Sequence, residues 1–185
     1  VGFRHLLAHV ERHLDRQRFL DSLSDITTIA RGPEPVAAMR EVGVKPSFAV
    51  EAPNTWREIL TTIDEHLTIA NQTVVLQEYG KTNPSLIAGL EARGAHVLNI
   101  RVYNWDLPDD VGPLEENIQR LCSGEADVAL FTSANQVVNM LQVADQMDLS
   151  DQLRGCFSNV VVASIGPTTS EALRDLDLPV DLEPS

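Results

Sequence analysis

The sequence has 185 residues, 43% of them hydrophobic and 22% charged, so the chain can bury a core as one large domain or two small ones. Lysine and arginine total 14 against 27 aspartate and glutamate residues, and the formal net charge of −13 opposes a nucleic-acid-binding role. The same charge repels anionic small molecules at long range. An anion site therefore has to rely on local donors such as helix N-termini and single basic side chains.

Cysteine usage and hydropathy indicate the cellular setting. Cys122 and Cys156 are far apart in the sequence and match no metal or redox spacing, which favours a reducing cytoplasm. The most apolar stretch, residues 160–165, is far shorter than the roughly 20 residues that span a bilayer, and no signal peptide opens the chain. We therefore expect a soluble, cytoplasmic protein without a disulfide framework, a membrane segment or a metal site.

The first predicted element is an amphipathic helix near the start of the chain. Its buried face is predicted from apolar residues at helical spacing: Phe3, Leu6, Leu7, Val10 and Leu14. The histidines at positions 5, 9 and 13 lie beside that face, so we interpret them as a solvated stripe rather than as metal ligands.

The rest of the chain alternates between strands and helices. Helices are predicted at residues 54–67, 84–93, 109–121, 136–146 and 167–176, and strands at residues 73–77, 96–103, 127–131 and 160–162. Strands that alternate with helices of about 10–15 residues indicate parallel sheets in doubly wound α/β units. Antiparallel all-β folds are excluded.

An internal repeat underlies this alternation. Gly32-Pro33 and Gly166-Pro167 are 166 − 32 = 134 residues apart, and residues 1–47 align with residues 135–181 without a gap. The same offset pairs Leu7 with Leu141, Ala38 with Ala172 and Arg40 with Arg174. The repeat predicts two copies of one supersecondary unit. We expect the leading strand of the first copy and the flank after the second copy to be missing from this sequence.

Three stretches carry a resemblance to a known family. They are residues 131–134 (Phe-Thr-Ser-Ala) at a strand end, residues 165–173 (Ile-Gly-Pro-Thr-Thr-Ser-Glu-Ala-Leu) with Leu-Pro-Val at 178–180, and Val102-Tyr103. Together they resemble the uroporphyrinogen-III synthase family. This resemblance implies two similar flavodoxin-like, doubly wound parallel-sheet domains joined by a two-stranded linker. On that layout residues 1–47 belong to the first-copy lobe and residues 48–53 cross the linker. Residues 54–181 then form the second lobe, and residues 182–185 begin the return linker.

The resemblance also implies an activity. The family's reaction cyclises hydroxymethylbilane to uroporphyrinogen III, with inversion of ring D and loss of water, and it makes the protein a lyase of tetrapyrrole (porphyrin and heme) biosynthesis. No metal or organic cofactor is implied, and the expected partner is the small-molecule substrate of a monomer, not nucleic acid or a membrane. Loss of the hydroxyl gives a reactive azafulvene-type cation. Positioning of the substrate and a donor to the departing hydroxyl are therefore the expected contributions of the protein.

The resemblance assigns roles to residues at two strand ends. Tyr103 matches the family's tyrosine and is the expected donor to the leaving hydroxyl, with an aromatic that closes the core as the alternative. Thr168 and Thr169 follow Gly166 at a predicted helix start, where N–H groups and hydroxyls bind carboxylates, although ordinary helix capping uses the same residues.

Three further loops contribute candidates for substrate binding. Thr132, Ser133 and Asn135 follow a strand at its carboxyl end, where open α/β sheets collect ligands, although a plain turn has the same composition. The loop after the strand at 73–77 offers Gly80 and Lys81, with Lys81 either meeting a substrate carboxylate or remaining solvated. In the first copy an anion site would depend on Arg31, and the nearby Glu34 weakens that prediction.

Two other classes of function stay open. The same bilobal fold can serve as a noncatalytic ligand-sensing module of a regulatory protein, which a downstream basic helix-turn-helix segment would favour. Tyr103 together with Thr168 and Thr169 favours the enzyme. A flavodoxin-like carrier of a nucleotide or flavin is the third class, and the loops lack the phosphate-binding glycines that it needs.

Overall fold

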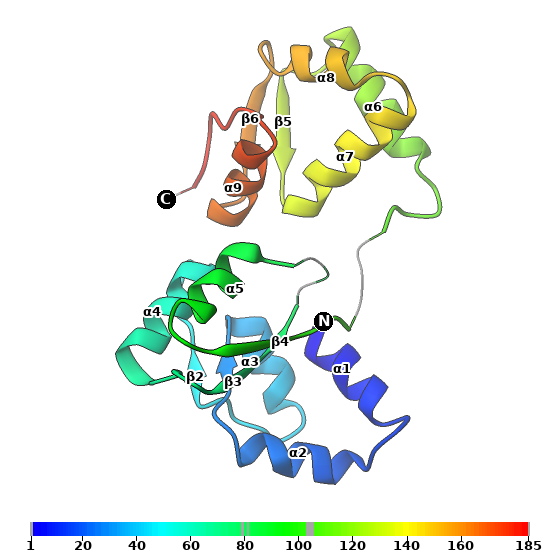
Figure 1. Cartoon of the computed structure of the whole chain (residues 1–185). Helices are drawn as coiled ribbons and strands as arrows, with labels where there is room; N and C mark the ends of the chain where they lie inside the picture. Colours follow the sequence, from blue (N-terminus) through cyan, green and yellow to red (C-terminus); the bar gives the residue numbers. More distant parts are fainter. Residues whose placement is uncertain (1, 79, 81, 103–105, 185) are drawn as a thin grey trace. The chain divides into compact units, whose positions relative to one another are not determined.

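The computed structural model in Figure 1 describes residues 2–78, 80, 82–102 and 106–184. The chain divides into two compact units, Val1–Trp105 and Asp106–Ser185. In both units the strands pair in parallel and helices connect them. The predicted α/β class with parallel strands is therefore confirmed.

Unit 1 contains two parallel strand pairs among its described residues. Its elements are α1 (Gly2–Val10), α2 (Arg16–Ser24), β1 (Ile29–Ala30), α3 (Pro33–Arg40), β2 (Phe48–Ala49), α4 (Trp56–His66), β3 (Thr73–Gln77), α5 (Pro84–Glu91) and β4 (His96–Ile100). β1 pairs with β2, and β3 pairs with β4. Figure 1 shows α4 and α5 lying together beside the β3–β4 pair, where Leu60 and Leu90 pack with Val74 and Val97.

Unit 2 has a larger core. Its elements are α6 (Gly112–Ser123), β5 (Val128–Phe131), α7 (Ala134–Gln146), α8 (Ser150–Cys156), β6 (Val161–Ser164) and α9 (Pro167–Asp175). Each helix has at least one completely buried residue in this core, among them Ile118, Val137, Leu153 and Leu173. The strands alternate, so that Ala129, Phe131 and Val162 face the helices while Leu130 is 63% exposed on the other side.

The structure reproduces the repeat. The parallel pairing of Ile29 with Phe48 recurs 134 residues later as a parallel bridge between Ala163 and Leu182. Gly32 and Gly166 both cap a helix whose first position is proline, which lacks the N–H that would be unpaired there. The repeat therefore extends one element beyond the sequence match, to the strand after the glycine-capped helix.

The compact units are divided at another place than the predicted linker. The sequence analysis placed the linker crossing at residues 48–53 and assigned residues 54–181 to the second lobe, and that layout of lobes stays a prediction. The chain divides into its compact units between residues 105 and 106. Ile29 of the first copy packs against the cluster formed by α4, α5 and the β3–β4 pair, so residues 54–100 lie in the same compact unit as the first copy.

Local differences have local causes. The first helix ends at Val10, so Leu14 is 64% exposed and does not belong to the predicted buried face. The next helix, α2, begins directly after Asp15, which caps it by accepting a hydrogen bond from the N–H of Arg18 at 2.7 Å. The helix α8 was not predicted, although it begins 134 residues after α2. The sequence signal for α2 was the capping residue Asp15, and the signal for α8 was the 134-residue offset of the repeat.

Candidate functional site

The carboxyl ends of β5 and β6 lie side by side in unit 2. The two strands are parallel and in register, with Phe131 opposite Ser164, and the N–H of Ile165 donates to the carbonyl of Phe131 at 2.9 Å. The turn after each strand therefore reaches the same edge of the sheet. This edge brings together the predicted residues of both turns: Thr132, Ser133, Asn135, Gly166, Thr168 and Thr169.

The turn after β5 is held by its own polar side chains. Ser133 caps α7, and its hydroxyl oxygen accepts from the N–H of Asn135 at 3.2 Å. The amide oxygen of Gln136 accepts from the N–H of Thr132 at 2.8 Å and from its hydroxyl at 3.2 Å. The hydroxyl of Ser133 still has its own hydrogen to donate. Gln136 also lines a cavity of about 570 Å³ between α6 and β5.

The turn after β6 separates the two predicted threonines. Gly166 caps α9, and its carbonyl accepts from the N–H groups of Thr169 and Ser170 at 3.1 and 3.0 Å. Thr168 is exposed, whereas Thr169 is only 4% exposed. Ser170 is fully buried, and its hydroxyl forms a 2.5 Å hydrogen bond with that of Ser164. Thr168 therefore presents an exposed hydroxyl, while Thr169 packs beneath it, and the carboxylate clamp predicted for the two threonines stays a prediction.

Charged residues occupy the carboxyl ends of β3 and β4 in unit 1. Glu78 directly follows β3, and its N–H donates to the carbonyl of Ile100 at 2.9 Å, which continues the strand pairing. Its carboxylate lies 3.3 Å from the Nε of Arg101, which directly follows β4. Nη2 of Arg101 is also 3.3 Å from the hydroxyl of Thr82. Sequence reasoning missed this group, although a charged residue directly after each of two neighbouring strands was the available signal.

The remaining predicted residues are placed as follows. Gly80 lies in the loop after β3 and has a φ of 64°, a left-handed conformation that favours glycine. Arg31 directly follows β1 and is exposed, as is Glu34 in the first turn of α3. Lys81 and Tyr103 lie outside the described residues, so their predicted roles stay predictions.

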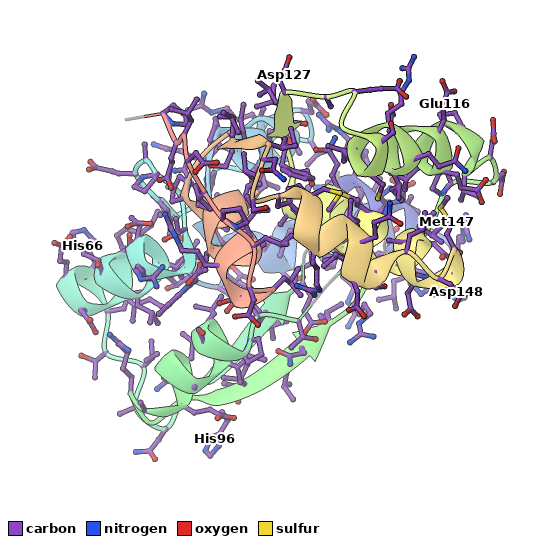
Figure 2. The ribbon with its side chains drawn as sticks, turned by 90° about the horizontal axis from the view of Figure 1, so that it is seen from above. His66, His96, Glu116, Asp127, Met147 and Asp148 are labelled. Atoms are coloured by element: carbon purple, nitrogen blue, oxygen red, sulfur yellow. The ribbon has the colours of Figure 1, made fainter. Side chains whose placement is uncertain are left out.

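The excess negative charge of unit 2 lies on its surface. Figure 2 shows the side chains of Glu116 on α6 and of Asp148 after α7 pointing outward, and both residues are exposed. Exposed charges of this kind are screened within about 10 Å in ordinary salt, so they do not prevent local donors from binding an anion at the sheet edge.

The two cysteines lie close together despite their separation in sequence. Cys122 on α6 and Cys156 on α8 line the same cavity of about 250 Å³. Burial raises the pKa of the Cys122 thiol, and the neighbouring Cys156 raises it further. Cys122 is therefore protonated at neutral pH, and the structure contains it as a free thiol.

Within the described residues, no group of three or more histidine, cysteine, aspartate or glutamate side chains is arranged to hold a metal ion. In the same part of the chain, no helix is both long enough and apolar enough to cross a membrane.

Fold and site together define a parallel α/β protein with polar residues gathered at the carboxyl edges of its strand pairs, where such proteins bind ligands. A family model described as uroporphyrinogen-III synthase HemD matches residues 1–185. The chain belongs to the uroporphyrinogen-III synthase family.

The individual relatives and solved structures described next are 25–28% identical to this chain. The uncharacterized protein YjjA of Bacillus subtilis (strain 168) is 28% identical over 180 residues, which are 95% of this chain and 64% of that protein. A mutant uroporphyrinogen III synthase from the extremely thermophilic bacterium Thermus thermophilus is 25% identical, with a TM-score of 0.68 over 100% of this chain and 68% of that one. The wild-type enzyme from the same bacterium has a TM-score of 0.55, covering 98% of this chain and 67% of that one at 25% identity. The chain thus spans about two thirds of the length of these relatives.

Proposed function

We propose that this chain carries the substrate-binding and catalytic residues of a uroporphyrinogen-III synthase, a cytoplasmic, monomeric lyase of heme biosynthesis. The reaction is the cyclisation of hydroxymethylbilane to uroporphyrinogen III, with inversion of ring D and loss of water. The observation that carries the proposal is the family match over residues 1–185. The hydroxyl-rich edge of the β5–β6 pair supports it, because the substrate is a polycarboxylate that needs donors there.

The proposed fold behind this function is a pair of flavodoxin-like, doubly wound domains joined by a two-stranded linker. The parallel pairing in both units supports it. The exposed Val128 and Leu130, at 56% and 63%, also support it, because a doubly wound sheet carries apolar residues on both faces.

Substrate carboxylates bind at the strand edges in this proposal. In unit 2 the exposed hydroxyl of Thr168, the first turn of α9 after Gly166, and the turn of Thr132, Ser133 and Asn135 act as donors. In unit 1 the donors come from Arg31 and from the loop of Gly80 and Lys81. Thr169 contributes by fixing the helix start from the buried side.

Tyr103 acts at the reacting carbon. Its phenolic O–H donates to the hydroxymethyl oxygen as the carbon–oxygen bond breaks, and water leaves with that proton. The substituted α-carbon of ring D, which the bound carboxylates hold nearby, attacks the azafulvene-type cation and gives a spiro intermediate. The original bond between ring D and its methylene bridge then breaks, and the freed methylene bonds to the unsubstituted α-carbon of ring D. This inverts ring D, and the proton lost from that carbon restores the phenol of Tyr103. The protein gains rate chiefly by positioning the two ends of the linear substrate.

The test is an isomer assay on the full-length natural protein. Hydroxymethylbilane is generated in a coupled reaction, and the ratio of uroporphyrin III to uroporphyrin I is measured after oxidation. We expect type III to predominate, Tyr103→Phe to lower kcat about 100-fold through loss of a proton donor, and Thr168→Ala to raise KM about tenfold through loss of one hydrogen bond to a charged group.

Arg120→Gln is the control, because Arg120 is a 57% exposed arginine outside the proposed site. Formation of type I alone at the spontaneous rate would contradict the proposal and favour a noncatalytic ligand-sensing module.

A further inference from the structure

Glu78 is a buried acid with one unused oxygen. Its side chain is 2% exposed, and Oε1 has no hydrogen-bond partner among the residues that the structure describes. A buried carboxylate is unfavourable unless a charge or donor compensates it. Among the described residues, the charged group that approaches it is the guanidinium of Arg101, 3.3 Å from Oε2.

Arg101 is held from two sides and yet remains accessible. Nε contacts the carboxylate of Glu78, which follows β3, and Nη2 contacts the hydroxyl of Thr82 in the loop before α5. The Arg101 side chain is nevertheless 56% exposed. A guanidinium has five N–H donors, and these two contacts use only two of them.

Two other paired arginines of unit 1, Arg93 and Arg4, differ in geometry. Nε and Nη2 of Arg93 contact both oxygens of Asp64 at 2.6 Å, and Arg4 contacts both oxygens of Glu41 in the same forked way. Those forked pairs join two surface side chains and use the edge of the guanidinium that best fits a carboxylate. In Arg101 the Nε/Nη2 edge is divided between Glu78 and Thr82, with one 3.3 Å contact each. Among the described residues nothing contacts Nη1, so the Nη1/Nη2 end of this guanidinium keeps N–H donors for a second carboxylate.

The location also favours a ligand. Glu78 and Arg101 directly follow two paired parallel strands, at the carboxyl edge where α/β sheets bind small molecules. In a chain with a net charge of −13, a carboxylate ligand needs such a local cation.

We propose that Arg101 binds a carboxylate of the substrate and that Glu78 is a positioning residue, which holds the guanidinium at this edge. The identity of the ligand rests on the proposed function. The planar guanidinium of Arg101 can donate two parallel hydrogen bonds to one carboxylate. The ammonium group of a lysine at the same position does not reproduce this geometry.

The experiment uses the full-length protein with four variants. Arg101→Lys keeps the charge beside Glu78 but loses the fork. The double variant Glu78→Gln/Arg101→Gln removes both charges, so that no buried carboxylate is left without a counter-charge. Glu78→Gln tests positioning alone. Arg120→Gln is the matched control, since Arg120 is 57% exposed and pairs with Glu116 and Glu125.

Two readouts separate binding from folding. We expect KM for hydroxymethylbilane, and Kd for the octacarboxylate uroporphyrin III by fluorescence titration, to rise about tenfold in the three site variants, the effect of one charge-assisted hydrogen bond. We expect kcat of the three site variants to change less than twofold. We expect Arg120→Gln to leave KM and Kd unchanged. A lower Tm with unchanged KM and Kd would overturn the proposal, because it would make the pair purely structural.

The outcomes also separate this inference from the proposed function. If the wild type forms type III and Arg101→Lys leaves KM and Kd unchanged, the function stands and the inference fails. If the wild type forms no type III but binds uroporphyrin III in an Arg101-dependent way, the inference stands and the function fails. If the wild type neither reacts nor binds uroporphyrin III, both are overturned.

Discussion

The two copies of the repeat share a backbone and differ in chemistry. Each has a strand, a glycine-capped helix with proline first, and a parallel pairing one element later. The residue in the first turn after the proline is Glu34 in the first copy and Thr168 in the second. The same helix start therefore carries an acid in one copy and a hydroxyl in the other. Its first turn suits an anion only in the second copy, whereas the proposed donor of the first copy is Arg31, which precedes the helix.

The interior behind the helix start differs in the same way. Ser164 and Ser170 form a buried hydrogen bond in the second copy, and their equivalents in the first copy are Ala30 and Val36. Ala30 is 2% exposed, so the apolar solution also fits this backbone. The two copies thus share their backbone structure and differ in the polar side chains at equivalent positions.

The largest expected effect concerns the unequal cores. Leu173 and its equivalent Met39 occupy the same place in the two copies, but Leu173 is fully buried in the large core of unit 2 and Met39 belongs to a smaller cluster. We expect Leu173→Ala to lower the free energy of unfolding by about 4 kcal/mol and Met39→Ala by about 2 kcal/mol. Urea denaturation monitored by circular dichroism measures the free energy of unfolding of both variants.

Leu14→Ala is the control, since Leu14 is 64% exposed and we expect no measurable change. A larger loss for Met39→Ala than for Leu173→Ala would mean that the first copy, not the second, is the better packed one.

The buried hydroxyl pair gives the next effect. Ser164→Ala alone removes the partner of the buried Ser170 hydroxyl, and Ser170→Val alone leaves the Ser164 hydroxyl with only a 3.5 Å contact to the carbonyl of Gly166. We expect a loss of about 2 kcal/mol from either change. The double variant recreates the pairing found in the first copy, and we expect it to be close to the wild type in stability. Equal and additive losses in a double-mutant cycle would show that the two copies are not interchangeable at this position.

A smaller effect on stability is expected from the helix cap of α4, which is made by side chains and not by a glycine. Unlike the helices that begin after Gly32 and Gly166, α4 has a capping box in which Thr55 and Glu58 satisfy each other's backbone N–H groups. The hydrogen bond from the Thr55 hydroxyl lowers the pKa of Glu58. We expect Thr55→Ala to cost about 1 kcal/mol at neutral pH.

The pH dependence follows from the direction of that shift. A carboxyl whose pKa is lowered by folding stabilises the folded state above its unfolded pKa, about 4.3 for glutamate, and loses that contribution as the pH falls through the folded value. The difference between wild type and Thr55→Ala should therefore shrink in acid. Thr61→Ala, on the exposed side of the same helix, is the control. A difference that grows on acidification would contradict the assigned bond.

The smallest effect concerns a surface pair present in one copy only. Arg4 and Glu41 form an ion pair in the first copy, and the position equivalent to Arg4 in the second is Val138. Both side chains are about half exposed, at 52% and 54%, so solvent screens the pair. We expect Arg4→Gln to leave Tm within experimental error. A clear loss of Tm would make this pair part of the fold of the first copy.

Periodicity and the repeat predicted most of the fold. The strand at residues 73–77 agrees with β3, and the predicted helices at 54–67 and 136–146 overlap α4 and α7. These elements have strong local signals. The division into units depends on which helices share a core, and nothing local in the sequence reports that Ile29 packs with α4 and α5.

The candidate site was predictable only in part. Motif residues identified the edge of the β5–β6 pair, but two adjacent threonines could not be separated into one buried and one exposed, because that depends on the rotation of α9 against the core. Glu78 and Arg101 are 23 residues apart, and they meet because β3 and β4 pair in parallel. Sequence spacing alone does not contain that contact.

The most direct test exchanges the first-turn residues of the two copies. Formation of uroporphyrinogen III from hydroxymethylbilane would be measured for the full-length wild type, Thr168→Glu and Glu34→Thr. The account predicts predominant type III from the wild type, a KM raised at least about tenfold by the new negative charge in Thr168→Glu, and no change in Glu34→Thr. Type I alone from the wild type, or a KM that responds to position 34 and not to position 168, would contradict it.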